Sequence, residues 1–157
     1  NRKPYYSVGN ETGHQQKIEL AGGRNIFSHR EGYFDTDPEA VVELNPEMIV
    51  RIATDVNGYN STDAKELQDI QREIVNRPEL SRVRAIERKE IFVINNQIVG
   101  NVRHFIGIAY MAKWFHPELF KDLDPQAIHQ EYLTRFQGLD YDLKTRGVFV
   151  YPPLEES

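Results

Sequence analysis

Short apolar runs alternate with longer segments of helical periodicity along most of the chain. Residues 48–53 (MIVRIA) and 91–94 (IFVI) are nearly continuous apolar runs, which is the pattern of strands buried on both faces of a sheet. The segment between them carries one apolar stripe at helical spacing, formed by Ala64, Leu67, Ile70, Ile74 and Val75. The pattern therefore predicts a strand, a helix and a second strand in this order.

Residues 37–46 carry the clearest signals for the two ends of a helix. Asp37 can accept a hydrogen bond from the first turn, Pro38 suits the first helical position, and Glu39 complements the positive end of the helix dipole. Pro46 is expected to end this helix.

Four further elements are predicted around this unit. Residues 3–9 (KPYYSVG) indicate a strand, and a helix that starts near His14 is expected to end at Gly22 and Gly23. Residues 103–115 are apolar almost all round, which predicts a helix buried on several sides, and Asp124 with Pro125 opens another helix.

Alternating strands and helices predict an α/β fold, namely a three-layer α/β/α lobe with a mainly parallel central sheet. Residues 1–157 are expected to form one domain, because a chain of this size buries enough surface for a real core. Ligands of such sheets meet the loops after the carboxyl ends of strands. Those loops are predicted at residues 54–60, at residues 95–103 and after the first strand.

Composition narrows the classes of function. The formal charge is -5, and the basic residues are scattered rather than gathered in a stripe, so nucleic acid is not expected as a partner. No apolar run approaches the roughly 20 residues that cross a bilayer. The start lacks both Met and a signal segment, which indicates a cut inside a longer chain. The absence of Cys removes disulfides and thiolate ligands from consideration.

Several segments, taken in order, resemble the C-terminal lobe of the ABC-transporter periplasmic binding proteins that capture siderophores, haem, cobalamin and some oxyanions. These segments are ELAGGRNIF, DPEAVVELNPEMIV, RPELSRVRAIERKEIFVI, RHFIGIAYMAKWFHPELF, and EYLTRFQG with GVFVYP. Each is generic alone, but together they span most of the chain.

The resemblance implies a class III periplasmic-binding-protein fold and a protein that is not an enzyme. This chain would be the C-terminal lobe of a bilobed extracytoplasmic protein, either periplasmic or anchored at the outer membrane surface, with its N-terminal lobe missing. That protein would capture an iron chelate, such as a siderophore or haem, and deliver it to an ABC permease dimer; cobalamin or an oxyanion such as molybdate is the alternative ligand. It would hold no intrinsic cofactor and no metal of its own. The resemblance also gives Glu39 a role in permease docking, whereas the dipole of its helix gives Glu39 a local structural role.

Five residues are candidates for ligand binding in the predicted cleft loops. Arg103 is suited to carboxylate or phosphate-like oxygens, and His104 can ligate a metal or act only as a polar group at a helix start. Tyr33 and Tyr59 can stack on a bulky ligand or donate a hydrogen bond to it, as can Asn57 by its amide, although Asn57 precedes Gly58 and Asn-Gly is also a turn signal.

Two other classes of function remain open. One is a small α/β metal-dependent enzyme with a metal-assisted or acid/base site built on Arg103, His104 and a loop carboxylate, although no His-Glu-x-x-His or Gly-x-Ser-x-Gly spacing is present. The other is an interaction domain without a small ligand.

Overall fold

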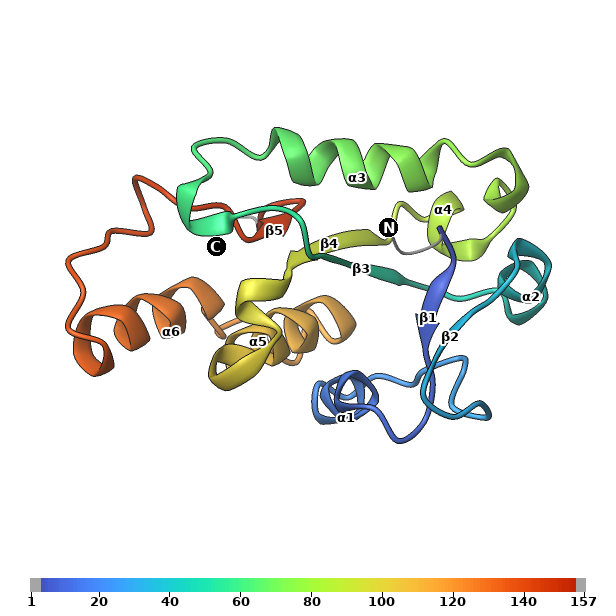
Figure 1. Cartoon of the computed structure of the whole chain (residues 1–157), viewed down its shortest axis with the longest axis horizontal. Helices are drawn as coiled ribbons and strands as arrows, with labels where there is room; N and C mark the ends of the chain where they lie inside the picture. The colour runs from blue at the N-terminus through green and yellow to red at the C-terminus, as the bar shows by residue number, and fades with distance from the viewer. Residues whose placement is uncertain (1–3, 155–157) are drawn as a thin grey trace.

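The computed structural model describes residues 4–154 as two small sheets with helices packed around them (Figure 1). The larger sheet contains β3 (Ile49–Ala53), β4 (Ile91–Asn95) and β5 (Val150–Tyr151), with β4 in the centre. β3 and β4 are parallel, whereas the short β5 runs antiparallel to β4. The strand, helix and strand predicted between residues 48 and 94 are therefore confirmed.

Helices cover both faces of this sheet (Figure 1). α3 (Lys65–Val75) lies on one face, where Leu67 packs with Ala53 and Val93. α5 (His104–Phe115) and α6 (Pro125–Glu131) lie on the other face, where the Trp114 ring stacks on Phe92 with 4.6 Å between the ring centroids. The α/β class and the three-layer arrangement are thus confirmed.

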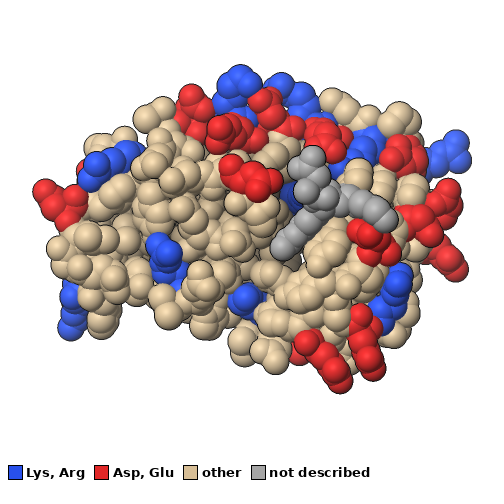
Figure 2. Space-filling view, in the orientation of Figure 1, with Lys and Arg blue, Asp and Glu red and all other residues tan. Residues whose placement is uncertain are grey.

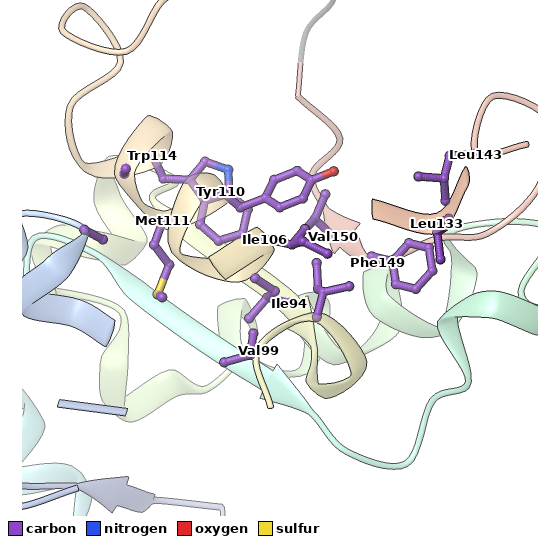
Figure 3. Close-up of a cluster of buried hydrophobic side chains, with 13 residues drawn as sticks. Ile94, Val99, Ile106, Tyr110, Met111, Trp114, Leu133, Leu143, Phe149 and Val150 are labelled. Atoms are coloured by element: carbon purple, nitrogen blue, oxygen red, sulfur yellow. The ribbon is translucent and has the colours of Figure 1, made fainter. Parts of the chain in front are cut away.

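A cluster of buried side chains joins α5 to the sheet (Figure 3). Ile106, Tyr110 and Met111 of α5 pack in one cluster with Ile94 and Val150 of the strands. Burying an aliphatic side chain of this size stabilises the fold by roughly 1.5–3 kcal/mol. Because this cluster fixes α5 against the sheet, it also fixes the position of the residues at the start of that helix.

Aspartate caps set the starts of two helices. The Asp37 carboxylate accepts a hydrogen bond from the Ala40 N–H at 2.9 Å and begins α2 (Pro38–Leu44), as the sequence predicted. The Asp124 carboxylate accepts from Ala127 N–H at 2.9 Å in the same way and begins α6. Both caps satisfy N–H groups that the first turn of a helix leaves without a partner.

β1 (Tyr6–Val8) and β2 (Tyr33–Asp35) form a second, antiparallel sheet. The predicted first strand is thus present, but this strand does not join the central sheet. Lys3, the first residue of that prediction, lies outside the described residues. β1 leads into α1 (Gly13–Leu20), which lies well away from the carboxyl ends of β3 and β4 (Figure 1). The loop after the first strand is therefore not beside the other two predicted ligand loops. β2 was not expected, because three residues in a polar segment carry no pattern of their own.

Short helical turns fill the connections. These are η1 (Gly58–Asn60), η2 (Pro78–Leu80), α4 (Arg84–Glu87), η3 (Asn96–Ile98), η4 (Asn101–Arg103) and a π-helical turn, η5 (Tyr132–Phe136). Three of them, η1, η3 and η4, follow the carboxyl ends of β3 and β4. The end of the central sheet is therefore lined by compact turns.

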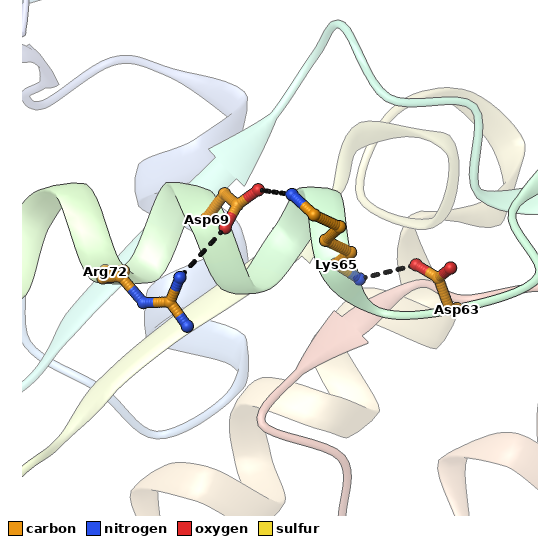
Figure 4. A network of polar contacts seen from close by, with 4 residues as sticks. All are labelled: Asp63, Lys65, Asp69 and Arg72. Atoms are coloured by element: carbon orange, nitrogen blue, oxygen red, sulfur yellow. Dashed lines mark hydrogen bonds and ion pairs between the residues drawn. The ribbon is translucent and has the colours of Figure 1, made fainter.

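The exposed side of α3 is covered by charged side chains of both signs (Figure 2). Lys65 Nζ donates to the Asp69 carboxylate at 2.5 Å, the Arg72 guanidinium lies 3.4 Å from the same carboxylate, and the Asp63 carboxylate accepts from the Lys65 N–H at 2.9 Å (Figure 4). Such exposed pairs contribute a few tenths of a kcal/mol each. This side of α3 is a solvated surface.

Within residues 4–154, no helix has the length and apolar character that crossing a membrane requires.

Candidate functional site

The loops after β3 and β4 are joined by the side chain of Asn95. Asn95 is fully buried at the end of β4, and its amide nitrogen donates to the Val56 carbonyl at 2.8 Å. Its amide oxygen accepts from the Gln97 N–H, also at 2.8 Å. One side chain therefore fixes the loop after β3 and the loop after β4 relative to each other, at the edge of the sheet where ligands of such folds bind.

Gln97 makes a second connection between the same two loops. Its side-chain oxygen accepts from the Tyr59 N–H at 3.4 Å, and its side-chain nitrogen donates to the Asn57 side-chain oxygen at 3.1 Å. Gly58 allows this arrangement, since a Cβ at this position would lie 2.7 Å from the Phe149 ring and 2.8 Å from the Val148 carbonyl oxygen. The backbone that carries Tyr59 is consequently held close to the segment before β5.

Tyr59, Arg103 and His129 form a chain of polar contacts at this edge. The Tyr59 hydroxyl lies 2.8 Å from Nε2 of His129, and an Nη1 of Arg103 donates to the same hydroxyl at 3.3 Å. The Arg103 guanidinium also lies 5.5 Å from the centroid of the Tyr59 ring, within the range of a cation–π contact. The three residues come from η1, η4 and α6.

Burial sets the protonation states in this chain of contacts. Burial and, to a lesser extent, the positive charge of Arg103 together lower the pKa of His129 to about 4. Burial likewise raises the pKa of Tyr59, against the opposing effect of Arg103. The imidazole is therefore neutral and the phenol is protonated at neutral pH. Tyr59 and His129 thus share one hydrogen bond between neutral groups, and the Tyr59 oxygen accepts a second one from Arg103.

A pocket of about 420 Å³ opens beside Tyr59 and Arg103. Its walls come from η1, η4, the π-helical turn and the segment after it: Tyr59, Val102, Arg103, Tyr132, Leu133, Gln137, Leu139 and Tyr141. Nε of Arg103 is buried and has no hydrogen-bond partner among residues 4–154. The pocket therefore combines a cation with incomplete hydrogen bonding and walls that are mostly apolar or aromatic.

The five residues predicted to bind ligand do not all lie together. Tyr59 and Arg103 line this pocket, and Asn57 is connected to it through Gln97. His104 is exposed, and its Nδ1 lies 2.8 Å from the Asn101 carbonyl oxygen, which fits a polar group at a helix start.

Tyr33 and Glu39 lie in the other half of the molecule. Tyr33 belongs to β2, which is far from η1 (Figure 1), and its ring stacks on Tyr6 with 6.1 Å between centroids. It borders a second, wider hollow of about 820 Å³ that β1, α1 and β3 also line. Glu39 is exposed in the first turn of α2.

Sequence reasoning missed three residues of the site: His129, Tyr132 and Tyr141. His129 is 1% exposed and lies one helical turn before the buried Leu133. A histidine within an apolar stripe was the available signal. Tyr141, whose hydroxyl donates to the Tyr59 carbonyl at 2.7 Å, is in an irregular segment that has no pattern to identify it.

The described residues offer no ready metal centre of their own. Within residues 4–154, no three His, Asp or Glu side chains lie close enough together to hold a metal ion. What the pocket provides is a guanidinium, phenol hydroxyls and one amide. These groups recognise the oxygen atoms or the flat surface of a ligand rather than a bare cation.

No model of a known protein family matches the sequence, and the search of curated proteins gives no match either. Solved structures are similar. The TroA-like periplasmic binding protein FepB from Veillonella parvula superposes with a TM-score of 0.75 and 23% identity, over 92% of this chain and 43% of that protein.

Two further structures give the same result. The molybdate periplasmic binding protein MolA from Haemophilus influenzae, bound to molybdate, has a TM-score of 0.71 and 19% identity, over 90% of this chain and 41% of its own. CeuE from Helicobacter pylori, with Ni(II) bound, has a TM-score of 0.70 and 22% identity, over 88% and 43%. The chain thus spans less than half the length of each, and at these identities the similarity establishes the fold.

Proposed function

We propose that this chain, which has the fold of one part of a TroA-like periplasmic binding protein, is a lobe of an extracytoplasmic substrate-binding protein that serves an ABC importer. One observation carries the proposal. The pocket of Tyr59 and Arg103 lies at the carboxyl ends of the parallel strands, and the chain covers only 43% of FepB from Veillonella parvula. The rest of such a protein would supply the opposite wall of the ligand cleft. This lobe, the C-terminal one by the order of its sequence segments, would then bind rather than convert its ligand.

The ligand is proposed to be a metal chelate, with an iron chelate such as a siderophore or haem first. An arginine and tyrosine hydroxyls are suited to chelate oxygens, and the chelate would bring its own metal. The solved structures of CeuE and MolA contain Ni(II) and molybdate, so the fold accommodates different cargoes. Cobalamin or an oxyanion remains the alternative.

The partner is proposed to be the permease dimer of the importer, with Glu39 as the docking residue on this lobe. Glu39 is exposed at the start of α2, on a part of the surface that the ligand pocket does not include. A carboxylate in this position is available to pair with an arginine of another protein.

The test is native mass spectrometry and absorbance of the full-length protein purified from its own host. We expect a metal-bearing species to accompany the protein and to be lost in Arg103→Ala. The control is Arg72→Ala, which removes an exposed arginine on α3, and it should retain the species. The proposal would be contradicted if the protein is purified without a bound ligand and binds none of a panel of iron chelates, corrinoids and oxyanions.

A further inference from the structure

The charge of Arg103 is not neutralised inside the pocket. None of the described residues that line the pocket is Asp or Glu, and the buried His129 nearby is neutral at the pH of most compartments. The Tyr59 hydroxyl accepts one hydrogen bond from the guanidinium. A half-buried guanidinium whose one hydrogen-bond partner is neutral favours an anion as its next neighbour.

The Arg103 guanidinium also has N–H donors beyond the one that bonds to Tyr59. Its Nε is buried without a partner among residues 4–154, while Nη1 is held by Tyr59. With Nη1 on Tyr59, the edge formed by Nε and Nη2 is the one that can present two parallel N–H groups to a ligand in the pocket. That geometry matches the two oxygens of a carboxylate.

Most of the other lining residues are aliphatic or aromatic, and Gln137 adds one amide. Leu133 is buried in the pocket wall, and Val102 and Leu139 at its mouth are 71% and 50% exposed. The Tyr132 ring adds a flat surface and is held edge-on by Phe105, with 5.6 Å between ring centroids. Exposed apolar side chains grouped at the mouth of a pocket lose contact with water when an apolar molecule covers them.

The π-helical turn supports this arrangement. It runs from Tyr132 to Phe136, and its first two residues, Tyr132 and Leu133, line the pocket. Such turns widen the backbone, are rare, and are frequent at functional sites. Here the wide turn places the Tyr132 ring in the pocket wall and carries the chain on to Gln137 and Leu139, which are also lining residues.

We infer that this pocket selects a ligand that joins a carboxylate to a flat apolar body, and that it does not retain a bare inorganic oxyanion. A small tetrahedral oxyanion needs several donors around it, and among the described lining residues only Arg103 is cationic. The free-energy cost of removing such an anion from water beside Val102, Leu133 and Leu139 would not be offset by hydrogen bonds from one arginine. The inference rests on the proposed function, because it specifies the ligand of the same site.

Calorimetry on the full-length protein tests it with three probes: 2-naphthoate, its neutral isostere 2-naphthamide, and molybdate. We expect naphthoate to bind about tenfold more tightly than naphthamide, since the carboxylate adds charged hydrogen bonds to Arg103. Molybdate should give no binding heat. Arg103→Gln should abolish the preference for the carboxylate, and Leu139→Ser should weaken both naphthalene probes alike.

The matched control is Arg72→Gln, which removes an exposed arginine far from the pocket and should leave all three titrations unchanged. Equal affinity for naphthoate and naphthamide, binding of molybdate alone, or no binding of either naphthalene probe would each overturn the inference. The proposed importer role has a separate readout, which is stimulation of the permease ATPase by the protein. A failure of the ligand class is therefore distinguishable from a failure of the function.

Discussion

The hydroxyl of Tyr59 lies 2.8 Å from Nε2 of His129, although 70 residues separate the two in sequence. The contact links the loop after β3 to α6, and the Phe149 ring packs edge-on against both rings, at 4.6 and 4.8 Å between centroids. Tyr59 therefore has little freedom to turn away from the pocket. The position of a ligand-facing side chain depends here on a helix that does not itself line the pocket.

The buried His129 predicts a dependence of stability on pH. Its pKa is about 4 in the folded protein, below the ordinary value of 6.5, so the unfolded chain binds a proton that the folded chain does not. The contribution of His129 to the free energy of unfolding should therefore be fully present above about pH 6.5. It should fall by up to about 3 kcal/mol as the pH drops toward 4. Urea unfolding across this range measures it. His129→Gln should remove this part of the slope, and an identical slope in both proteins would contradict the assignment.

Asn95 is predicted to hold the two ligand loops together. Asn95→Ala removes hydrogen bonds to Val56 and Gln97 and leaves their backbone groups without these partners. The free energy of unfolding should fall by about 2–4 kcal/mol. Asn60→Ala, at an exposed position in η1, is the control and should change it by less than about 0.5 kcal/mol. Denaturant titration of both variants gives the comparison, and an equal loss in the two would argue against a special role for Asn95.

Gly58 is predicted to be required for close packing beneath Tyr59. A Cβ in Gly58→Ala would lie 2.7 Å from the Phe149 ring and 2.8 Å from the Val148 carbonyl oxygen. Overpacking of this kind should lower the stability by about 1–3 kcal/mol. It should also weaken ligand binding, because Tyr59 moves with its backbone.

Gly13→Ala is the matched control for this substitution. A Cβ at Gly13 would meet only Lys17 Nζ, at 3.8 Å, and alanine favours the helix that starts there. Thermal unfolding should show a lower Tm for Gly58→Ala alone. A loss of similar size in Gly13→Ala would point to a general sensitivity to substitution.

Glu39 is predicted to act in docking and not in ligand binding. Glu39→Lys should abolish stimulation of the permease ATPase, while ligand affinity stays unchanged because the residue is outside the pocket. The protein itself should lose no more than about 1 kcal/mol from the unfavourable charge at the start of α2. Glu43→Lys, exposed near the end of the same helix, should retain stimulation. Full stimulation by Glu39→Lys would exclude the docking role.

Local signals explain how far the sequence predicted this fold. Asp37 and Pro38 define the start of α2 through contacts within a few residues. The apolar stripe of α3 indicates which side of that helix faces the sheet. These features depend on nearby residues, so a pattern identifies them. β2 was missed because its partner strand is distant in sequence, as in the pair Tyr6 and Asp35.

The site was predicted only where it follows from strand order. Arg103 and Tyr59 come together because parallel strands bring the loops after them to one edge. Tyr33 was predicted to lie in a loop on the cleft side, but it belongs to β2 in the second sheet, which separates it from Arg103 and Tyr59. His129 contacts Tyr59 from α6, and Tyr141 lines the pocket from the irregular chain after that helix. Only the packing in three dimensions identifies such contributions.

The central place of β4 determines which part of the molecule opens last. β4 pairs with β3 on one side and β5 on the other, and its Val93 and Ile94 are fully buried. Amide protons of β4 are therefore exchanged for deuterium only when the whole molecule unfolds. The three-residue strands β1 and β2, paired only with each other among the described strands, exchange through smaller local openings. Asn95, at the end of β4, thus belongs to the slowly exchanging part of the chain, and Tyr33 of β2 belongs to the rapidly exchanging part.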